Sequence, residues 1–200
     1  GERIFATYNR GKRSIAVDLK SEQGRGTITA LFERADVVLE GFRPGVAERL
    51  GIGYRQARAI NPKLVYCSIS SFGQDGPYRD RTAHDLNCLS LAGYFAIPSQ
   101  VNDRIARPKV RLADYAAAMH AALGVTQALM TVRLGGDGCH LDVAIQESIS
   151  AWCLPHALAV RDGEAGDMEH AESVMPDNDL FRCADGRWLS LGIFENRYWG

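Results

Sequence analysis

The sequence lacks a clear excess of charge of either sign. Lysine and arginine together number 23 and aspartate and glutamate 24 in 200 residues, so the formal net charge is −1. This balance excludes a nucleic-acid-binding protein that works through bulk positive charge, and it excludes an acidic disordered tail. With 46% hydrophobic and 24% charged residues, the chain has the composition of a globular protein that can bury a core.

Cysteine is scarce and scattered. The five cysteines are Cys67, Cys88, Cys139, Cys153 and Cys183, and no two of them are spaced as Cys-x-x-Cys. An odd number at these spacings argues against a disulfide framework and against a structural zinc site. We therefore expect a protein of the reducing cytoplasm, and the alternative is a secreted protein with one stray thiol.

Several signature motifs are also missing. The sequence contains neither GxGxxG nor GxxxxGK[ST], so a standard dinucleotide site or P-loop is not expected in this segment. The absence of GxSxG weakens the hypothesis of a serine hydrolase. His84, His156 and His170 have no clustered partners and no HExxH pattern, so we expect no metal site.

An apolar leader and a membrane span are not expected either. Residues Gly1–Arg13 are polar and lack the apolar region of a signal peptide. The most apolar window, Tyr115–Val132, is mostly alanine and contains His120 and Gln127, which is typical of a buried helix rather than a membrane span. The chain has no initiator methionine and stops just after an aromatic-rich run. We therefore expect a segment of a longer protein.

What the first half contains is an alternation of strand and helix patterns. Alternating or continuous apolar runs predict strands at Ser14–Leu19, Val37–Leu39 and Leu64–Ile69. Helical spacing, the N-cap chemistry of Ser21 and the placement of Pro44 predict helices at Gly24–Arg34, Val46–Leu50 and Tyr54–Ile60. Strand followed by helix followed by strand predicts an α/β fold, a doubly wound parallel sheet of the Rossmann-like kind.

The second half continues the alternation and then changes character. The expected elements are a helix at Asp85–Leu91, an alanine-rich helix from Asp114 to Gly135, a strand at His140–Ile145, a helical stretch at Gln146–Val160 and a β-hairpin formed by Leu180–Cys183 and Trp188–Phe194. The acidic, aperiodic run Arg161–Pro176 predicts a linker. We expect residues 1–165 to form a large α/β domain, and residues 166–200 to contain the linker and the start of a smaller α+β domain.

Four features could carry chemistry, and each has a plainer interpretation that is favoured when the feature is taken singly. Asn9–Arg13 places three cations around a glycine, which suits a phosphate, but a solvated basic turn explains it as well. His84 stands where a loop meets a helix, as many structural or exposed histidines do. Asp114 could be an N-cap of the alanine-rich helix, and Glu195 could be a surface residue after a strand.

The order of the motifs resembles that of a known family. The motifs are NRGKRSIAVDLK, DVVLEGFRPGVAERLGIGY, NPKLVYCSISSFGQDGPY, AHDLNCLSLAG, LADY, GCHLDVAIQES and FRCADGRWLSLGIFE. Together they are similar to the family III CoA-transferases, or CaiB/BaiF family, over essentially all 200 residues. The His-Asp pair that begins at His84 most resembles the branch that contains α-methylacyl-CoA racemase. Family members normally have a further βα unit before this segment and the rest of a small domain after it, so we expect the segment to lack both.

The resemblance implies an enzyme that acts on acyl-CoA. In a racemase, His84 and Asp114 are the two proton-transfer groups that invert the α-carbon of a 2-methylacyl-CoA through an enolate, and Glu195 is the partner of the histidine. In the alternative, a CoA-transferase, Asp114 is a nucleophile that forms an anhydride and then an enzyme thioester. Such transferases generally have no histidine where this chain has His84. A third hypothesis is an acyl-CoA-binding relative without catalysis, which would need none of the three residues.

The resemblance also implies where coenzyme A is bound. The implied contacts are Arg13, Val17, Asp18, Leu19, Lys20, Phe42, Val46, Arg49, Ala83, Asp85, Leu86, Asn87 and Cys88. A guanidinium such as that of Arg49 matches phosphate oxygens bidentately, whereas Phe42 and Val46 could equally belong to a core.

Two departures from the family pattern are visible. Cys88 stands where racemase-like members often have tyrosine, and Asp114 is followed by Tyr-Ala-Ala-Ala where many members are rich in glycine. Beyond the acyl-CoA substrate, the resemblance implies no cofactor and no metal. The implied partner is a second copy of the chain in an interlocked homodimer, with no nucleic acid and no membrane.

Overall fold

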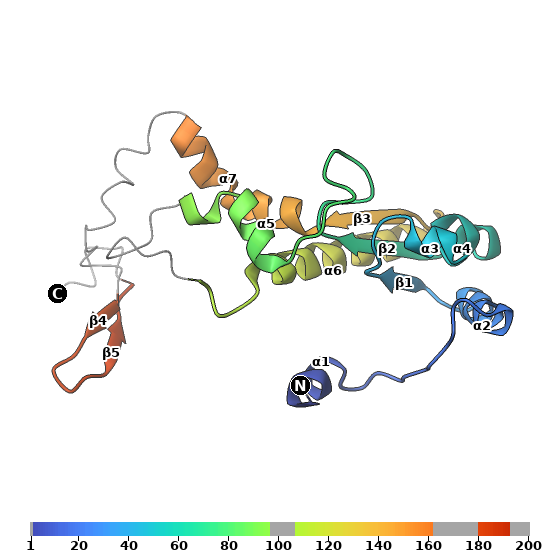
Figure 1. The fold of residues 1–200 in the computed structure, drawn as a ribbon, viewed down its shortest axis with the longest axis horizontal. Helices are drawn as coiled ribbons and strands as arrows, with labels where there is room; N and C mark the ends of the chain where they lie inside the picture. Colours follow the sequence, from blue (N-terminus) through green and yellow to red (C-terminus); the bar gives the residue numbers. More distant parts are fainter. Residues whose placement is uncertain (1, 97–106, 162–179, 193–200) are drawn as a thin grey trace.

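The centre of the fold is a three-stranded parallel sheet (Figure 1). The computed structural model describes residues 2–96, 107–161 and 180–192. In the sheet, β2 (Val65–Ser70) lies between β1 (Val37–Glu40) and β3 (His140–Ala144). Parallel neighbours need crossover connections, and helices supply them here. The predicted α/β fold with a parallel sheet is confirmed.

Helices lie in the connections between the three strands of this sheet, before β1 and after β3 in the chain. In chain order they are α1 (Glu2–Tyr8), α2 (Glu22–Phe32), α3 (Val46–Arg49), α4 (Tyr54–Ile60), α5 (Asp85–Leu91), the 3-10 helix η1 (Tyr94–Ala96), α6 (Leu112–Arg133) and α7 (Ile145–Arg161). The ranges of α4 and α5 match those predicted. As predicted, Ser21 caps α2, because its side chain accepts a hydrogen bond from the backbone N–H of Gly24 at 3.0 Å.

Position in the sheet decides how far each strand is buried. Val65, Tyr66 and Cys67 of the central strand β2 are at most 2% exposed, as expected for a parallel strand covered on both faces. β1 has one paired neighbour within the described sheet, and the side chain of Leu39 is 61% exposed. The apolar run at Val37–Leu39 therefore forms the predicted parallel strand without full burial.

Two clusters of buried side chains flank the sheet. The first packs α2, α3 and α4 against β2 and contains Phe32, Ala47, Ile52, Ala57, Leu64 and Tyr66. The second joins α5, α6 and α7 and contains Cys88, Leu89, Ala113, Ala116, Ile149 and Cys153. Because Cys88 and Ala113 lie in the first turns of their helices, the second cluster holds the N-terminal ends of α5 and α6 together.

The predicted strand at Ser14–Leu19 is wrong. This segment has no regular secondary structure, and the side chain of Ile15 is 61% exposed. An alternating, β-branched run becomes a strand only where a neighbour accepts its backbone hydrogen bonds, and neither sheet in the described part of the chain includes it. The run instead forms an extended connection between α1 and α2, visible at the blue end of Figure 1.

The second described sheet is the predicted hairpin. Its strands β4 (Leu180–Arg182) and β5 (Trp188–Ser190) pair antiparallel, with Arg182 opposite Trp188. The predicted linker beyond Arg161 and the end of the second predicted strand lie outside the described residues. The division into two domains stays a prediction.

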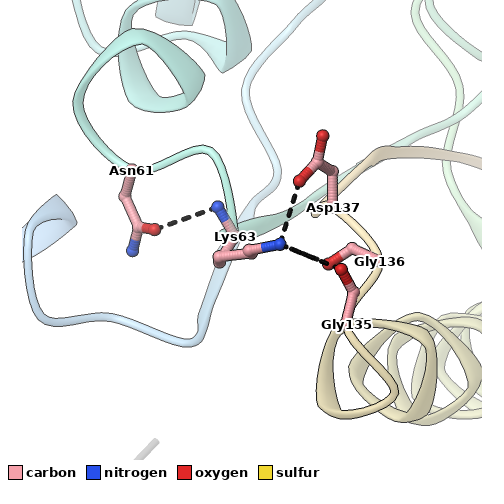
Figure 2. A network of polar contacts seen from close by, with 5 residues as sticks. All are labelled: Asn61, Lys63, Gly135, Gly136 and Asp137. Carbon is pink, nitrogen blue, oxygen red and sulfur yellow. Dashed lines mark hydrogen bonds and ion pairs between the residues drawn. The ribbon is translucent and has the colours of Figure 1, made fainter.

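Lys63 joins the starts of two neighbouring strands (Figure 2). Its Nζ donates hydrogen bonds to the carbonyl oxygens of Gly135 at 3.2 Å and Gly136 at 2.9 Å, and it lies 3.0 Å from Oδ1 of Asp137. The backbone N–H of Lys63 donates to Oδ1 of Asn61 at 3.1 Å. Since Lys63 precedes β2 and the other end of the network precedes β3, these contacts fix the amino edge of the sheet.

No helix among the described residues is both long enough and apolar enough to cross a membrane.

Candidate active site

A cavity of about 620 Å³ lies beyond the carboxyl ends of the strands. Its walls come from the segments that follow β1 and β2, together with Ile145 at the start of α7. Open parallel sheets bind ligands at this edge because successive loops converge there. Five residues implied by the family resemblance line the cavity: Phe42, Val46, Arg49, Ala83 and His84.

His84 is held at the start of α5. It is the N-cap residue, with extended backbone, and its N–H donates a hydrogen bond to Oδ1 of Asn87 at 3.0 Å. The side chain of Asn87 therefore fixes the backbone of His84, whereas the His84 side chain is exposed at the cavity. This arrangement presents the imidazole of His84 to a ligand in the cavity.

Asp85 caps a helix that is distant in sequence. Its Oδ1 accepts hydrogen bonds from the backbone N–H groups of Ala113 at 2.8 Å and Asp114 at 3.2 Å, in the first turn of α6. These N–H groups have no partner within their own helix, and a carboxylate suits the positive end of the helix dipole. Asp85 thus ties the start of α5 to the start of α6 and brings His84 and Asp114 to the same end of the molecule.

Asp114 is the third residue of α6, and the N-cap is Arg111. The plainer interpretation of Asp114 as an N-cap is therefore wrong. Its side chain is 37% exposed, and Oδ2 lies 3.9 Å from Nη1 of Arg111. Desolvation, and next the charge of Asp85, raise the pKa of Asp114 above its ordinary value, while Arg111 and His84 oppose this shift. Asp114 thus holds a proton at higher pH than an ordinary carboxyl group, and it lies close enough to His84 to interact with it electrostatically.

We call Asp85 and Asp114 the carboxylate pair. Cys88 lies close enough to both for their charges to act on its thiol. Its side chain is fully buried in the second core cluster. Burial, and then the charges of Asp114 and Asp85, raise the pKa of the Cys88 thiol to about 11. At neutral pH it is therefore an uncharged thiol, unsuited to act as a nucleophile.

Arginines are prominent in the lining of the cavity. We call Arg43, Arg49, Arg79 and Arg81 the arginine cluster; they line the cavity together with a single carboxylate, Asp80. Arg81 is positioned over the ring of Tyr78, with 4.5 Å between its Cζ and the ring centroid. Arg43, Arg79 and Arg81 were not predicted from the sequence. The signal in the sequence was Arg79-Asp80-Arg81, a pair of cations shortly before His84.

Other implied residues lie away from this cavity. Arg13, Val17, Asp18 and Lys20 do not line it, and all but the half-buried Val17 are exposed. Leu19 lines a second, apolar hollow of about 570 Å³ beside β1, which shares Phe42 with the cavity.

The Leu86 side chain is 40% exposed on α5. Glu195 lies outside the described residues. In the described part of the chain, no three His, Cys, Asp or Glu side chains form a group that could hold a metal ion.

Comparison with known proteins gives consistent matches. The sequence profile of CoA-transferase family III matches residues 1–200. Succinate–glutarate CoA-transferase from Agrobacterium fabrum is 36% identical over 155 residues, which are 76% of this chain and 39% of the relative. Human α-methylacyl-CoA racemase is 31% identical over 204 residues, covering 95% of this chain and 51% of the relative.

Solved structures agree with these matches. The crystal structure of Rv3272 from Mycobacterium tuberculosis superposes with a TM-score of 0.76 at 30% identity, over 95% of this chain and 50% of that one. A CaiB/BaiF family protein from Brucella suis gives a TM-score of 0.69 at 34% identity, over 76% of this chain and 41% of that one. The chain thus spans about half, or less, of the length of these relatives.

Proposed function

Because this chain belongs to CoA-transferase family III, a family of enzymes, we propose that the protein containing it is an acyl-CoA racemase in which His84 and Asp114 move the proton. The observation that carries the proposal is that His84 lines the cavity and interacts electrostatically with Asp114, which lies outside the cavity lining and has a raised pKa. The substrate is a 2-methylacyl-CoA thioester. The product is its epimer at the α-carbon.

The chemistry requires one proton-transfer group on each face of the α-carbon. The thioester carbonyl acidifies the α-hydrogen, one group removes it, and the planar enolate then accepts a proton from the other face. Histidine is the side chain most often used for general acid–base catalysis, and His84 supplies one of the two groups. A carboxylate exchanges protons near neutral pH only if its pKa is raised, and this is the effect of desolvation and Asp85 on Asp114.

The arginine cluster supports coenzyme A as the carrier of the acyl group. Coenzyme A is rich in phosphate, and guanidinium groups pair with phosphate oxygens. The arginine cluster and His84 line the same cavity, so a coenzyme A whose phosphates are bound by the cluster would lie in the cavity to which His84 is exposed. The partnership of Glu195 with His84, the homodimer and the cytoplasmic location stay predictions.

A CoA-transferase is the second candidate. It is favoured by the 36% identity to succinate–glutarate CoA-transferase. In this candidate, Asp114 attacks the thioester carbonyl, CoA thiolate leaves, and an aspartyl anhydride forms; CoA then attacks the Asp114 carbonyl, which releases the first carboxylate and leaves an enzyme thioester.

One experiment separates the two candidates. The full-length protein is incubated with a 2-methylacyl-CoA in deuterated water, and in parallel with the same thioester and a free carboxylic acid. The racemase predicts formation of the opposite epimer with deuterium at its α-carbon. This inversion is lost in Asp114→Asn and retained in Asp137→Asn, which changes an exposed aspartate at the opposite edge of the sheet. Transfer of CoA to the added acid without α-exchange, with an adduct on Asp114 that hydroxylamine traps, would establish the transferase instead. If acyl-CoA binds and neither reaction occurs, the proposal is wrong and the chain belongs to a binding-only relative.

A further inference from the structure

Two guanidinium groups meet over Gly45. If Gly45 carried a Cβ, that atom would lie 3.1 Å from Nη2 of Arg79 and 3.2 Å from Nη1 of Arg49. The two nitrogens can therefore be no farther apart than the sum of these distances. The backbone φ of Gly45 is +78°, a conformation that side chains disfavour, so glycine is suited both to the turn and to the close approach of the two cations.

The guanidinium of Arg79 already has two partners within the protein. Its Nε donates a hydrogen bond to the carbonyl oxygen of Gln74 at 2.7 Å, and its Nη1 lies 2.8 Å from Oδ1 of Asp80. These contacts involve Nε and Nη1, and Nη2 is the guanidinium nitrogen that lies next to Gly45. The side chain of Arg79 is 36% exposed, so its fork is partly ordered before any ligand arrives.

Arg49 approaches the same point from α3. Like charges at this separation repel, and the one carboxylate lining the cavity, Asp80, already pairs with Arg79 and is itself 82% exposed. A bound dianion between the guanidiniums would turn this repulsion into two attractions. Phosphate fits best, because its several oxygens accept hydrogen bonds from two forks at once, whereas a chloride ion offers no such geometry.

We propose that Arg79 acts with Arg49 as a two-guanidinium clamp that binds a phosphate group of the acyl-CoA substrate across Gly45. The assignment of the phosphate to coenzyme A rests on the proposed function; the clamp itself rests on the positions of the two arginines. The family resemblance implied a role for Arg49 and none for Arg79. Coenzyme A offers two sources of the phosphate, its diphosphate and its 3′-phosphate.

The test is calorimetric binding of coenzyme A, 3′-dephospho-CoA and inorganic pyrophosphate to the full-length protein. Arg79→Gln is expected to raise the Kd for coenzyme A on the order of 10- to 100-fold, the usual effect of losing a charge-assisted hydrogen bond. Arg55→Gln, which removes an exposed arginine from α4, is the matched control and should change Kd less than twofold. For turnover, the loss is expected in KM rather than in kcat.

A double-mutant cycle separates binding from a structural effect on the loop. If Arg49 and Arg79 grip one phosphate, Arg49→Gln combined with Arg79→Gln will weaken binding by a factor different from the product of the single effects. Retention of the Arg79→Gln effect with 3′-dephospho-CoA assigns the clamp to the diphosphate, and its disappearance assigns the clamp to the 3′-phosphate.

The proposal is overturned if Arg79→Gln binds coenzyme A within twofold of wild type, or if the two substitutions act independently. Racemase activity in the wild-type protein would be unaffected by that result. Conversely, if Arg79→Gln weakens coenzyme A binding and the wild-type protein catalyses neither reaction, the clamp is supported and the racemase proposal is wrong.

Discussion

Charge is handled differently by the carboxylate pair and by the arginine cluster. At the starts of α5 and α6, the carboxylate pair has partners within the protein: Asp85 accepts two backbone hydrogen bonds, and Asp114 lies beside Arg111. In the lining of the cavity, the arginine cluster places four cations together with one exposed carboxylate. Internal partners tune the affinity of a group for protons, whereas unneutralised charge is available for a ligand. The carboxylate pair is thus suited to proton transfer and the arginine cluster to holding an anion.

Of the substitutions that separate the role of the carboxylate pair from that of the arginine cluster, Asp114→Asn is expected to have the largest effect. Asparagine has the same shape and cannot exchange a proton, so epimerisation should fall about 10²- to 10⁴-fold while the Kd for coenzyme A stays within threefold of wild type. Epimer ratios and calorimetry measure the two quantities. A parallel loss of coenzyme A binding would contradict the division of roles between the carboxylate pair and the arginine cluster.

Asp85→Asn should change the pH profile. Asparagine keeps an acceptor oxygen for the N–H groups of Ala113 and Asp114 and removes the negative charge, which is the second cause that raises the pKa of Asp114. The pKa of Asp114 should therefore fall, and the acidic limb of kcat/KM in the direction that uses Asp114 as the base should move to lower pH. Steady-state rates from pH 4 to pH 9 show the shift; movement to higher pH would contradict the account.

Lys63→Met changes a residue outside the cavity and so tests whether the amino edge of the sheet affects stability alone. It removes the contacts with Gly135, Gly136 and Asp137 at the amino edge of the sheet, as drawn in Figure 2. These groups are exposed, so the free energy of unfolding should fall by about 1 kcal/mol, with epimerisation unchanged. Urea denaturation measures the first quantity. A large loss of activity in a folded protein would show that this edge of the sheet affects the site.

The smallest effect concerns stability and pH. Because the folded pKa of Asp114 is above that of an unfolded carboxyl group, the folded chain binds more protons between the two values, and stability falls as pH rises through this window. Asparagine does not ionise, so Asp114→Asn should not lose stability as the pH rises through this window. The gain at pH 7 should be less than about 1 kcal/mol, since the side chain is partly solvated, and should vanish below pH 3. Thermal unfolding at both pH values tests this, and a variant less stable than wild type at pH 7 would contradict it.

Local signals made part of this architecture predictable. The helices at Tyr54–Ile60 and Asp85–Leu91 follow from their own apolar spacing and the residues that bound them. Ser14–Leu19 has an equally clear strand pattern and forms no strand, because pairing depends on a neighbour that a local pattern does not contain.

The site depended even more on distant contacts. His84 and Asp114 were predicted through a family resemblance, since each has a common structural interpretation when taken alone. The hydrogen bonds that Asp85 accepts from α6 join residues that are separated by 28 and 29 positions in the sequence. The approach of Arg79 to Gly45 spans two loops that meet only because β1 and β2 are adjacent and parallel.

The most direct test of the central claim follows each pure epimer of a 2-methylacyl-CoA in deuterated water with the full-length wild type, His84→Gln and Asp114→Asn. If the two residues act on opposite faces of the α-carbon, the wild type will place deuterium in the product epimer. Each variant will lose epimerisation and keep exchange with one epimer only, and that epimer will differ between the two variants. The same pattern of exchange in both variants would contradict the claim that His84 and Asp114 are the two bases.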